Sequence, residues 1–205
     1  VKWEDGWPVL GVEGKVPVTL DLPASNGLIP GIVSSDDFKR RKGERPLPLV
    51  WQWKHNPDSS LWSVTKRQGY LRLTTGRIDT NFLFARNTLT QRTFGPVCSG
   101  STLLDMSLMK DGDFAGLALL QKNYGIVGVK ADGGGRSVVM INAGTGKPLQ
   151  EARLPLTGDI VYFKAECDFT DRKDVASFFY SLDGENWKQI GSQLKMTYTL
   201  PQHFM

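Results

Sequence analysis

The sequence predicts an all-β domain in which two antiparallel sheets pack face to face. From residue 50 onward, short runs of alternating apolar and polar residues recur about every 8 to 12 residues, separated by Gly, Asp and Asn. No stretch shows the periodicity of about 3.6 residues that marks an amphipathic helix of several turns. A hydrophobic content of 40% is enough to fill one core, which excludes a disordered chain.

The predicted strands follow one another from Val50 to the end of the chain. A further strand-like segment, 195–200, lies just before the last residues, and because a sandwich usually ends on a strand we expect the domain to lack its final strands. The predicted strands are Val50–Lys54, Leu61–Thr65, Tyr70–Thr74, Asn81–Ala85, Cys98–Leu108, Phe114–Gln121, Tyr124–Lys130, Arg136–Asn142, Asp159–Cys167, Val175–Leu182 and Trp187–Ile190.

A hairpin is predicted between the two strands around Asp183-Gly184. Aromatic and small residues alternate over 175–182, and the pattern resumes at Trp187. An Asp-Gly step adopts positive φ at low cost, so it favours a tight hairpin turn between antiparallel strands.

Composition divides the chain into two parts. Residues 1–31 contain Trp3 and Trp7 among four prolines and five glycines, without sustained periodicity. Residues 32–205 hold the strand pattern and are predicted to form the sandwich. We therefore expect residues 1–31 to depend on another surface rather than to fold as a domain.

The net charge of +4 raises the question of a nucleic-acid partner. Much of the excess lies in one polar loop, and the sequence has no helix-turn-helix, aromatic-basic or paired CxxC motif, so we interpret the loop as a solvated surface. No apolar run is long enough to span a membrane and no signal peptide is visible, which leaves the compartment open between bacterial cytoplasm and secretion. The basic residues of the loop are Lys39, Arg40, Arg41, Lys42 and Arg45.

The two cysteines, Cys98 and Cys167, are more consistent with buried free thiols than with a disulfide framework, although their pairing stays open. With only His55 and His203 beside them, a zinc site lacks ligands.

No catalytic residue is assigned from the sequence. Glycoside hydrolysis needs two carboxylates that face each other across a sugar, and no pattern provides such a pair. Glu166 and Asp168 are interpreted as a solvated strand end. Asp111 and Asp113 flank a glycine in a predicted turn, with a structural calcium ion as the alternative, and no cofactor is required.

Carbohydrate binding has more support, because aromatic rings stack on the C–H faces of sugars while nearby polar groups bond the hydroxyls. Trp51 and Trp53 would share one face of an extended strand. Core packing is the alternative for each ring. The candidates are Trp51, Trp53, Trp62 and Tyr124.

Several motifs in the same order make the chain resemble the C-terminal module of glycoside hydrolase family 43, whose members include β-xylosidases and α-L-arabinofuranosidases. The matching runs are Leu49-Val-Trp-Gln-Trp-Lys-His-Asn-Pro57, Leu61-Trp-Ser63, Gly69-Tyr-Leu-Arg-Leu73, Arg86-Asn-Thr-Leu-Thr-Gln-Arg-Thr-Phe-Gly-Pro96, Met109-Lys-Asp-Gly-Asp113, Ala115-Gly-Leu-Ala-Leu119, Ser181-Leu-Asp-Gly-Glu185 and Leu194-Lys-Met-Thr-Tyr-Thr-Leu200.

The resemblance implies a concanavalin A-like jelly roll that serves as an accessory module of a xylan-degrading enzyme. Its partners would be xylan or xylo-oligosaccharides and a five-bladed propeller catalytic domain, whose closing stretch the run Trp3-Glu-Asp-Gly-Trp-Pro-Val-Leu-Gly11 resembles. It also implies that Phe204, beside His203, lines the sugar pocket of that catalytic domain. A free-standing carbohydrate-binding module is the alternative function.

Overall fold

The computed structural model describes residues 2–9, 11–12, 15–19, 31–41 and 43–196. The chain forms two compact units, Val1–Gly31 and Ile32–Met205. In the first unit, β1 (Lys2–Glu4) and β2 (Trp7–Val9) form an antiparallel hairpin. Its turn is Asp5-Gly6, with φ of 48° and 82°. This Asp-Gly turn is a hairpin signal that the sequence analysis overlooked.

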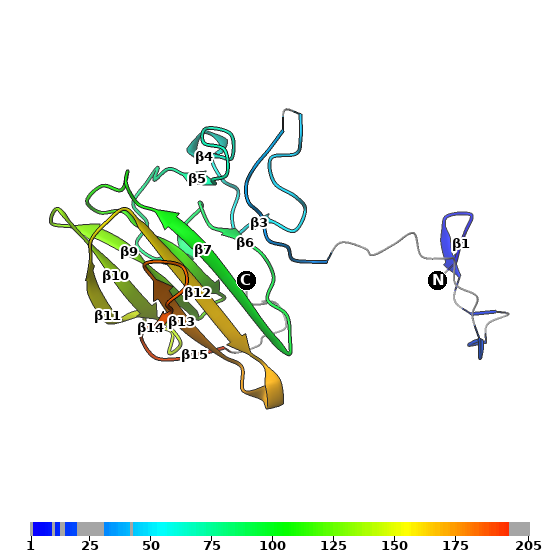
Figure 1. The fold of residues 1–205 in the computed structure, drawn as a ribbon. Coiled ribbons are helices and arrows are strands. Elements are labelled where there is room, and N and C mark those ends of the chain that lie inside the picture. The colour runs from blue at the N-terminus through cyan, green and yellow to red at the C-terminus, as the bar shows by residue number, and fades with distance from the viewer. Residues whose placement is uncertain (1, 10, 13–14, 20–30, 42, 197–205) are drawn as a thin grey trace. The chain divides into compact units, whose positions relative to one another are not determined.

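The second unit contains two antiparallel sheets packed against each other (Figure 1). One sheet is a four-stranded meander of β8 (Phe114–Leu120), β9 (Tyr124–Asp132), β10 (Gly135–Asn142) and β11 (Leu149–Leu156). The other has the order β14-β13-β12-β7, with β15 also paired to β13. Its strands are β7 (Val97–Asp105), β12 (Ile160–Asp168), β13 (Val175–Ser181), β14 (Lys188–Gln189) and β15 (Leu194–Lys195).

Shorter elements precede the sandwich in the chain. Two small antiparallel pairs form between 52 and 90, and three 3₁₀ turns complete the described elements. The pairs are β3 (Gln52–Trp53) with β6 (Leu89–Thr90) and β4 (Trp62–Ser63) with β5 (Arg72–Leu73), and the turns are η1 (Ser59–Leu61), η2 (Phe82–Phe84) and η3 (Thr170–Arg172). None of the helices in this described part is long and apolar enough to cross a membrane.

Strict alternation of side chains explains why these strands form a sandwich. In β12 every second side chain is buried, while the residues between them point to the opposite face. The apolar side chains of β12 and β13 meet those of β9 and β10 in one continuous core. Its fully buried members include Phe163 and Phe178 from one sheet and Val127, Val129 and Met140 from the other.

A glycine of β9 leaves room for a core ring of the opposite sheet. A Cβ atom on Gly125 of β9 would lie 2.6 Å from Cζ of Phe178, a separation that two carbon atoms do not tolerate. Glycine at this position therefore leaves room for the Phe178 ring.

The predicted all-β, two-sheet fold is confirmed, and most predicted strands are present, but two local predictions are wrong. The segment predicted as strand 81–85 is the 3₁₀ turn η2, because the Asn81 side chain accepts a hydrogen bond from the Leu83 N–H. Strand β11 was missed, although apolar and polar residues alternate over 152–154; its Pro155 is tolerated because β11 lies at the edge of its sheet.

The hairpin predicted around Asp183-Gly184 is confirmed. Strands β13 and β14 pair antiparallel, and the loop between them contains Asp183-Gly184. The Asp183 carboxylate accepts hydrogen bonds from the N–H groups of Glu185 and Asn186, at 2.9 and 2.8 Å, and so holds this loop in shape. Most of segment 195–200 lies outside the described residues, so the expectation that the domain lacks its final strands stays open.

The core predicts a sharp contrast between two neighbouring phenylalanines of β13. Phe178→Ala should lower the free energy of unfolding by about 3–5 kcal/mol, because it leaves a cavity between the sheets. Phe179→Ala, on the outer face, should cost only about 1 kcal/mol. Urea denaturation of both variants measures the difference, and equal losses would contradict the inward and outward assignment.

Candidate functional site

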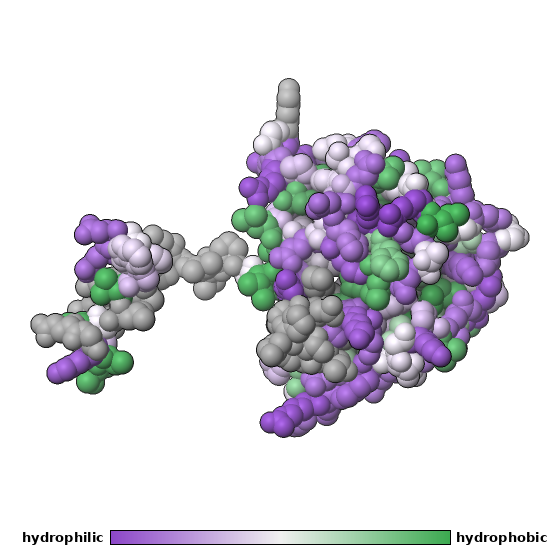
Figure 2. All heavy atoms as spheres, turned by 180° about the vertical axis from the view of Figure 1, so that it is seen from behind, coloured by the Kyte–Doolittle hydropathy of each residue, from purple (hydrophilic) through white to green (hydrophobic). Residues whose placement is uncertain are grey.

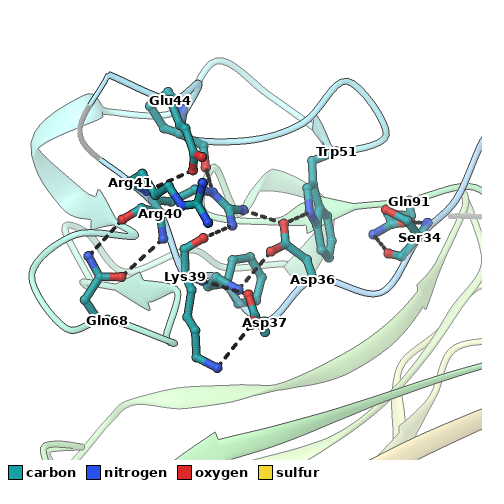
Figure 3. A network of polar contacts seen from close by, with 12 residues as sticks. Ser34, Asp36, Asp37, Lys39, Arg40, Arg41, Glu44, Trp51, Gln68 and Gln91 are labelled. Atoms are coloured by element: carbon teal, nitrogen blue, oxygen red, sulfur yellow. Dashed lines mark hydrogen bonds and ion pairs between the residues drawn. The ribbon is translucent and has the colours of Figure 1, made fainter. Parts of the chain in front are cut away.

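The first candidate, Trp51, belongs to a network centred on Asp36 (Figure 3). The Trp51 Nε1–H donates to Asp36 Oδ2 at 2.8 Å, and the Arg40 guanidinium binds the same oxygen at 2.5 Å. The backbone N–H of Phe38 donates to the other carboxylate oxygen at 2.8 Å, and the Phe38 ring stacks on Trp51 with 5.7 Å between centroids. The Trp51 side chain is therefore held in place by the hydrogen bond of its indole N–H and by the stacking of Phe38 on one face of its ring.

Arg40 is an internal ion-pair partner, unlike its basic neighbours. Its side chain is 9% exposed and that of Asp36 is 6% exposed. Arg40 also donates to the carbonyl oxygen of Pro46 at 2.7 Å, which ties both ends of the loop together. Burial raises the pKa of Asp36, but the hydrogen bonds from Arg40, Phe38 and Trp51 outweigh it and leave this pKa lowered. The carboxylate therefore stays ionised as the hub of the loop.

The other basic side chains of this loop fit the predicted solvated surface. Lys39 is 74% exposed and makes only a 3.3 Å ion pair with the exposed Asp37. Arg41 and Arg45 are also exposed, and Lys42 lies outside the described residues.

Trp53 and Trp62 form a second aromatic cluster. Their rings lie 5.3 Å apart with a tilt of 52°, one from β3 and the other from β4. Both are half-buried, and the buried Trp62 Nε1 has no hydrogen-bond partner in the described part of the chain. Strand β3 contains Trp53 but not Trp51. Trp51 packs on Phe38 and Trp53 on Trp62, so the two tryptophans do not form one stacking surface.

Tyr124 is a core residue, which corrects its assignment as a binding candidate. It is 4% exposed and packs against Phe82 with 5.1 Å between ring centroids. Burial raises its pKa. The ring has no free face on which a sugar could stack, and the signal that placed it in the core is the continuous apolar run of β9.

Asp111 and Asp113 organise the turn before β8. Asp111 accepts the Gly134 N–H at 3.1 Å, while Asp113 accepts the Lys110 N–H at 2.8 Å and the Thr75 hydroxyl at 3.0 Å. Among the described residues, no group of three or more His, Cys, Asp or Glu side chains is arranged to hold a metal ion. The turn interpretation accounts for both carboxylates.

The cysteines occupy directly opposed positions on neighbouring strands, Cys98 on β7 and Cys167 on β12. Both are free thiols, Cys167 buried and Cys98 half-buried. Burial, with the adjacent Cys98, raises the pKa of the Cys167 thiol, which makes it a poor nucleophile.

The acidic end of β12 lines a shallow groove of about 500 Å³ on the outer face of the five-stranded sheet. Glu166 makes a 2.8 Å ion pair with Lys164, and Asp168 makes one of 2.9 Å with Lys173. Hydrogen bonds from the Thr170 hydroxyl and from Lys173 lower the pKa of Asp168 to about 2. The other side chains that face the groove are Val97, Ser99, Val175, Ser177 and Gln193.

The sequence analysis missed this groove because its residues are distant in the chain. The available signal was the alternation over 175–182, which puts Ser177 and Phe179 on the face opposite the core side chains. The register that pairs Phe179 with Lys164 is known only from the structure. His203 and Phe204, the remaining candidates, lie outside the described residues.

Two antiparallel sheets closed over one core define this unit as a β-sandwich domain, and the comparisons identify its family. Residues 35–204 match the family described as beta xylosidase C-terminal concanavalin A-like domain. The chain belongs to this family, as its motifs indicated.

Relatives that the chain matches are much longer proteins. The structure of a bifunctional GH43-CE protein from Bacteroides eggerthii shares 61% identity with a TM-score of 0.82, over 97% of this chain and 26% of that chain. A beta-xylosidase of Formosa agariphila is 28% identical over 93% of this chain and 35% of its own length. A putative beta-xylosidase of Xylanibacter ruminicola is 30% identical, over 96% of this chain and 35% of its own. The chain thus spans about a third of the curated relatives it matches.

The Asp36 network predicts unequal effects of removing two adjacent cations. Arg40→Met should destabilise the protein by about 3 kcal/mol, because it leaves a buried carboxylate without its partner. Lys39→Met should change stability by less than about 0.5 kcal/mol, since its ion pair is solvated. Thermal unfolding followed by tryptophan fluorescence compares them, and similar melting temperatures would refute the buried role of Arg40.

Proposed function

We propose that the chain is the accessory C-terminal module of a xylan-degrading family 43 enzyme, in which it braces the catalytic domain and helps to shape its substrate pocket. The observation that carries the proposal is the match of residues 35–204 to this C-terminal domain family. The relatives devote about two thirds or more of their length to other parts. The parent activity would be an inverting β-xylosidase or α-L-arabinofuranosidase that acts on xylan-derived oligosaccharides.

The acidic residues of the groove do not favour catalysis by this chain. Glu166 and Asp168 project side by side from one face of one strand, so they do not flank a glycosidic bond from two sides. A general acid requires a raised pKa, whereas the pKa of Asp168 is lowered. Both carboxylates already form ion pairs with lysines.

The hairpin β1–β2 fits the closing part of a catalytic domain. Trp3 and Trp7 are 71% and 76% exposed, and each would gain about 2 kcal/mol from burial against a partner surface. The Bacteroides eggerthii match covers 97% of the chain, which is about 199 of 205 residues and therefore includes most of residues 1–34, outside the family match. This coverage supports residues 1–31 as a part of the parent enzyme.

The alternative function, a free-standing carbohydrate-binding module, has one observation in its favour, the polar groove with Phe179 and Trp187 near it around Lys164. On the face that Figure 2 shows, hydrophilic residues predominate and the hydrophobic patches are separate from one another.

A chimera tests the bracing role. The matched segment of the Bacteroides eggerthii protein is replaced by this chain, which is 61% identical to it, and a truncated protein without the segment is the control. We expect the chimera to hydrolyse an aryl xyloside or aryl arabinoside at a rate close to that of the intact protein, and the truncation to lose at least tenfold in kcat/KM. A truncated protein with full activity would refute the proposal.

This chain by itself should hydrolyse neither aryl xylosides nor aryl arabinosides, because two suitably placed carboxylates are required. The measurement is chromogenic substrate turnover at micromolar protein. Turnover that disappears in Glu166→Gln, with the thermal unfolding curve unchanged, would overturn the accessory assignment.

Phe204 is proposed to line the sugar pocket of the catalytic domain, as the family resemblance implies. An aromatic wall would exclude water and restrict the pocket to a small terminal sugar. In the chimera, Phe204→Ala should raise KM severalfold and leave the melting temperature unchanged, whereas the exposed control Phe84→Ala should change neither. A melting temperature lowered by several degrees with an unchanged KM would make Phe204 a core residue instead.

A further inference from the structure

The outer face of the β7–β12–β13 sheet carries a row of hydrogen-bonding side chains, and these give the polar groove its character. Glu166 lies opposite Ser99 on one side and Ser177 on the other, so three neighbouring strands place these groups side by side. Gln193, which precedes β15, extends the row, because its amide donates to the Ser177 hydroxyl at 3.1 Å. All four residues line the groove. Strands β7, β12 and β13 lie side by side in Figure 1.

Two aromatic rings lie beside this row on the same face. The Lys164 ammonium lies over one face of each ring, 4.8 Å from the centroid of Phe179 and 4.8 Å from that of Trp187. Lys164 and Phe179 are partners in the strand register, two residues along their strands from Glu166 and Ser177. Side chains two apart on a strand share one face, so the polar row and the rings form one surface.

The charges of this surface balance locally. Glu166 is neutralised by Lys164 at 2.8 Å, and Asp168 by Lys173 at 2.9 Å. A strongly anionic ligand would meet two carboxylates, and a cationic ligand would compete with lysines that are already in place. Each paired carboxylate oxygen still has lone pairs that accept hydrogen bonds from hydroxyl groups. The surface therefore favours a neutral ligand with many hydroxyls.

We infer that this outer sheet face binds one neutral polysaccharide chain, with its hydroxyls on Ser99, Glu166, Ser177 and Gln193 and a sugar face against Phe179 and Trp187. The inference rests on the proposed function only for the choice of a xylan-type chain. A protein partner is less suited to this face, because stable protein interfaces have an apolar core from which charged residues are depleted. The open groove implies weak binding, in the high-micromolar to millimolar range.

Calorimetric titration of this chain with xylohexaose tests the inference. Phe179→Ala and Glu166→Ala should each weaken binding at least fivefold, because one removes the stacking ring and the other an acceptor. The matched control is Asp159→Ala, which removes an exposed carboxylate that also pairs with one basic residue, Arg136 at 2.7 Å, and should change binding less than twofold. An anionic oligogalacturonate should not bind. Binding of xylohexaose that none of these variants alters, no binding at all, or equal binding of oligogalacturonate would overturn the inference.

A labelling experiment on the unaltered chain does not depend on the folding of variants. Xylohexaose should slow acetylation of Lys164, read by mass spectrometry, and leave the exposed Lys66 unaffected. Protection of Lys164 by an added family 43 catalytic domain, without protection by the sugar, would assign this face to domain docking and overturn the inference. The chimera experiment reports separately on the bracing role, so the two proposals fail independently.

Discussion

The packing of Phe163 and Phe178 between the two sheets is the contact on which the rest of the structure depends. Both side chains are completely buried, and the absence of a Cβ on Gly125 leaves the space that Phe178 occupies. Once alternate residues of β12 and β13 are fixed in the core, the residues between them must face outward. A slip of one residue in β12 would bury Lys164 and expose Phe163. The register that closes the core therefore also determines the composition of the outer face.

A second constraint holds the segment that enters the sandwich. The loop around Asp36 contains many cations, but its conformation depends on one buried carboxylate that receives an arginine, an indole N–H and a backbone N–H. The buried ion pair is satisfied because Arg40 also bonds the carbonyl of Pro46. This arrangement fixes Trp51 against Phe38 and leaves the remaining cations in solvent. The apparent basic patch is thus a structured loop with a solvated edge.

The family assignment and the chemistry of the described residues support the same division of labour. The chain belongs to a family of C-terminal domains, and it covers about a third of the curated relatives it matches. Among the described acidic residues, Asp113 accepts hydrogen bonds in a turn and Asp168 forms an ion pair with Lys173. These roles are compatible with the proposed accessory module, in which catalysis takes place in another part of the enzyme.

The sequence alone determined the fold class, the family and most strand positions, because alternation and turn residues are local properties that tertiary contacts reinforce here. The strand predicted at 81–85 failed for a local reason, because the Asn81 side chain caps a 3₁₀ turn. Strand β11 depended on the tertiary structure, because its edge position allows Pro155. The site depended still more on the tertiary structure. In the sequence, Tyr124 and Trp51 were equally good candidates for a sugar-stacking ring. Only the three-dimensional packing shows that Tyr124 lies in the core and that Trp51 is bound to Asp36. The groove joins β7, β12 and β13 with Gln193, residues separated by up to about 95 positions, and only sheet register brings such residues together.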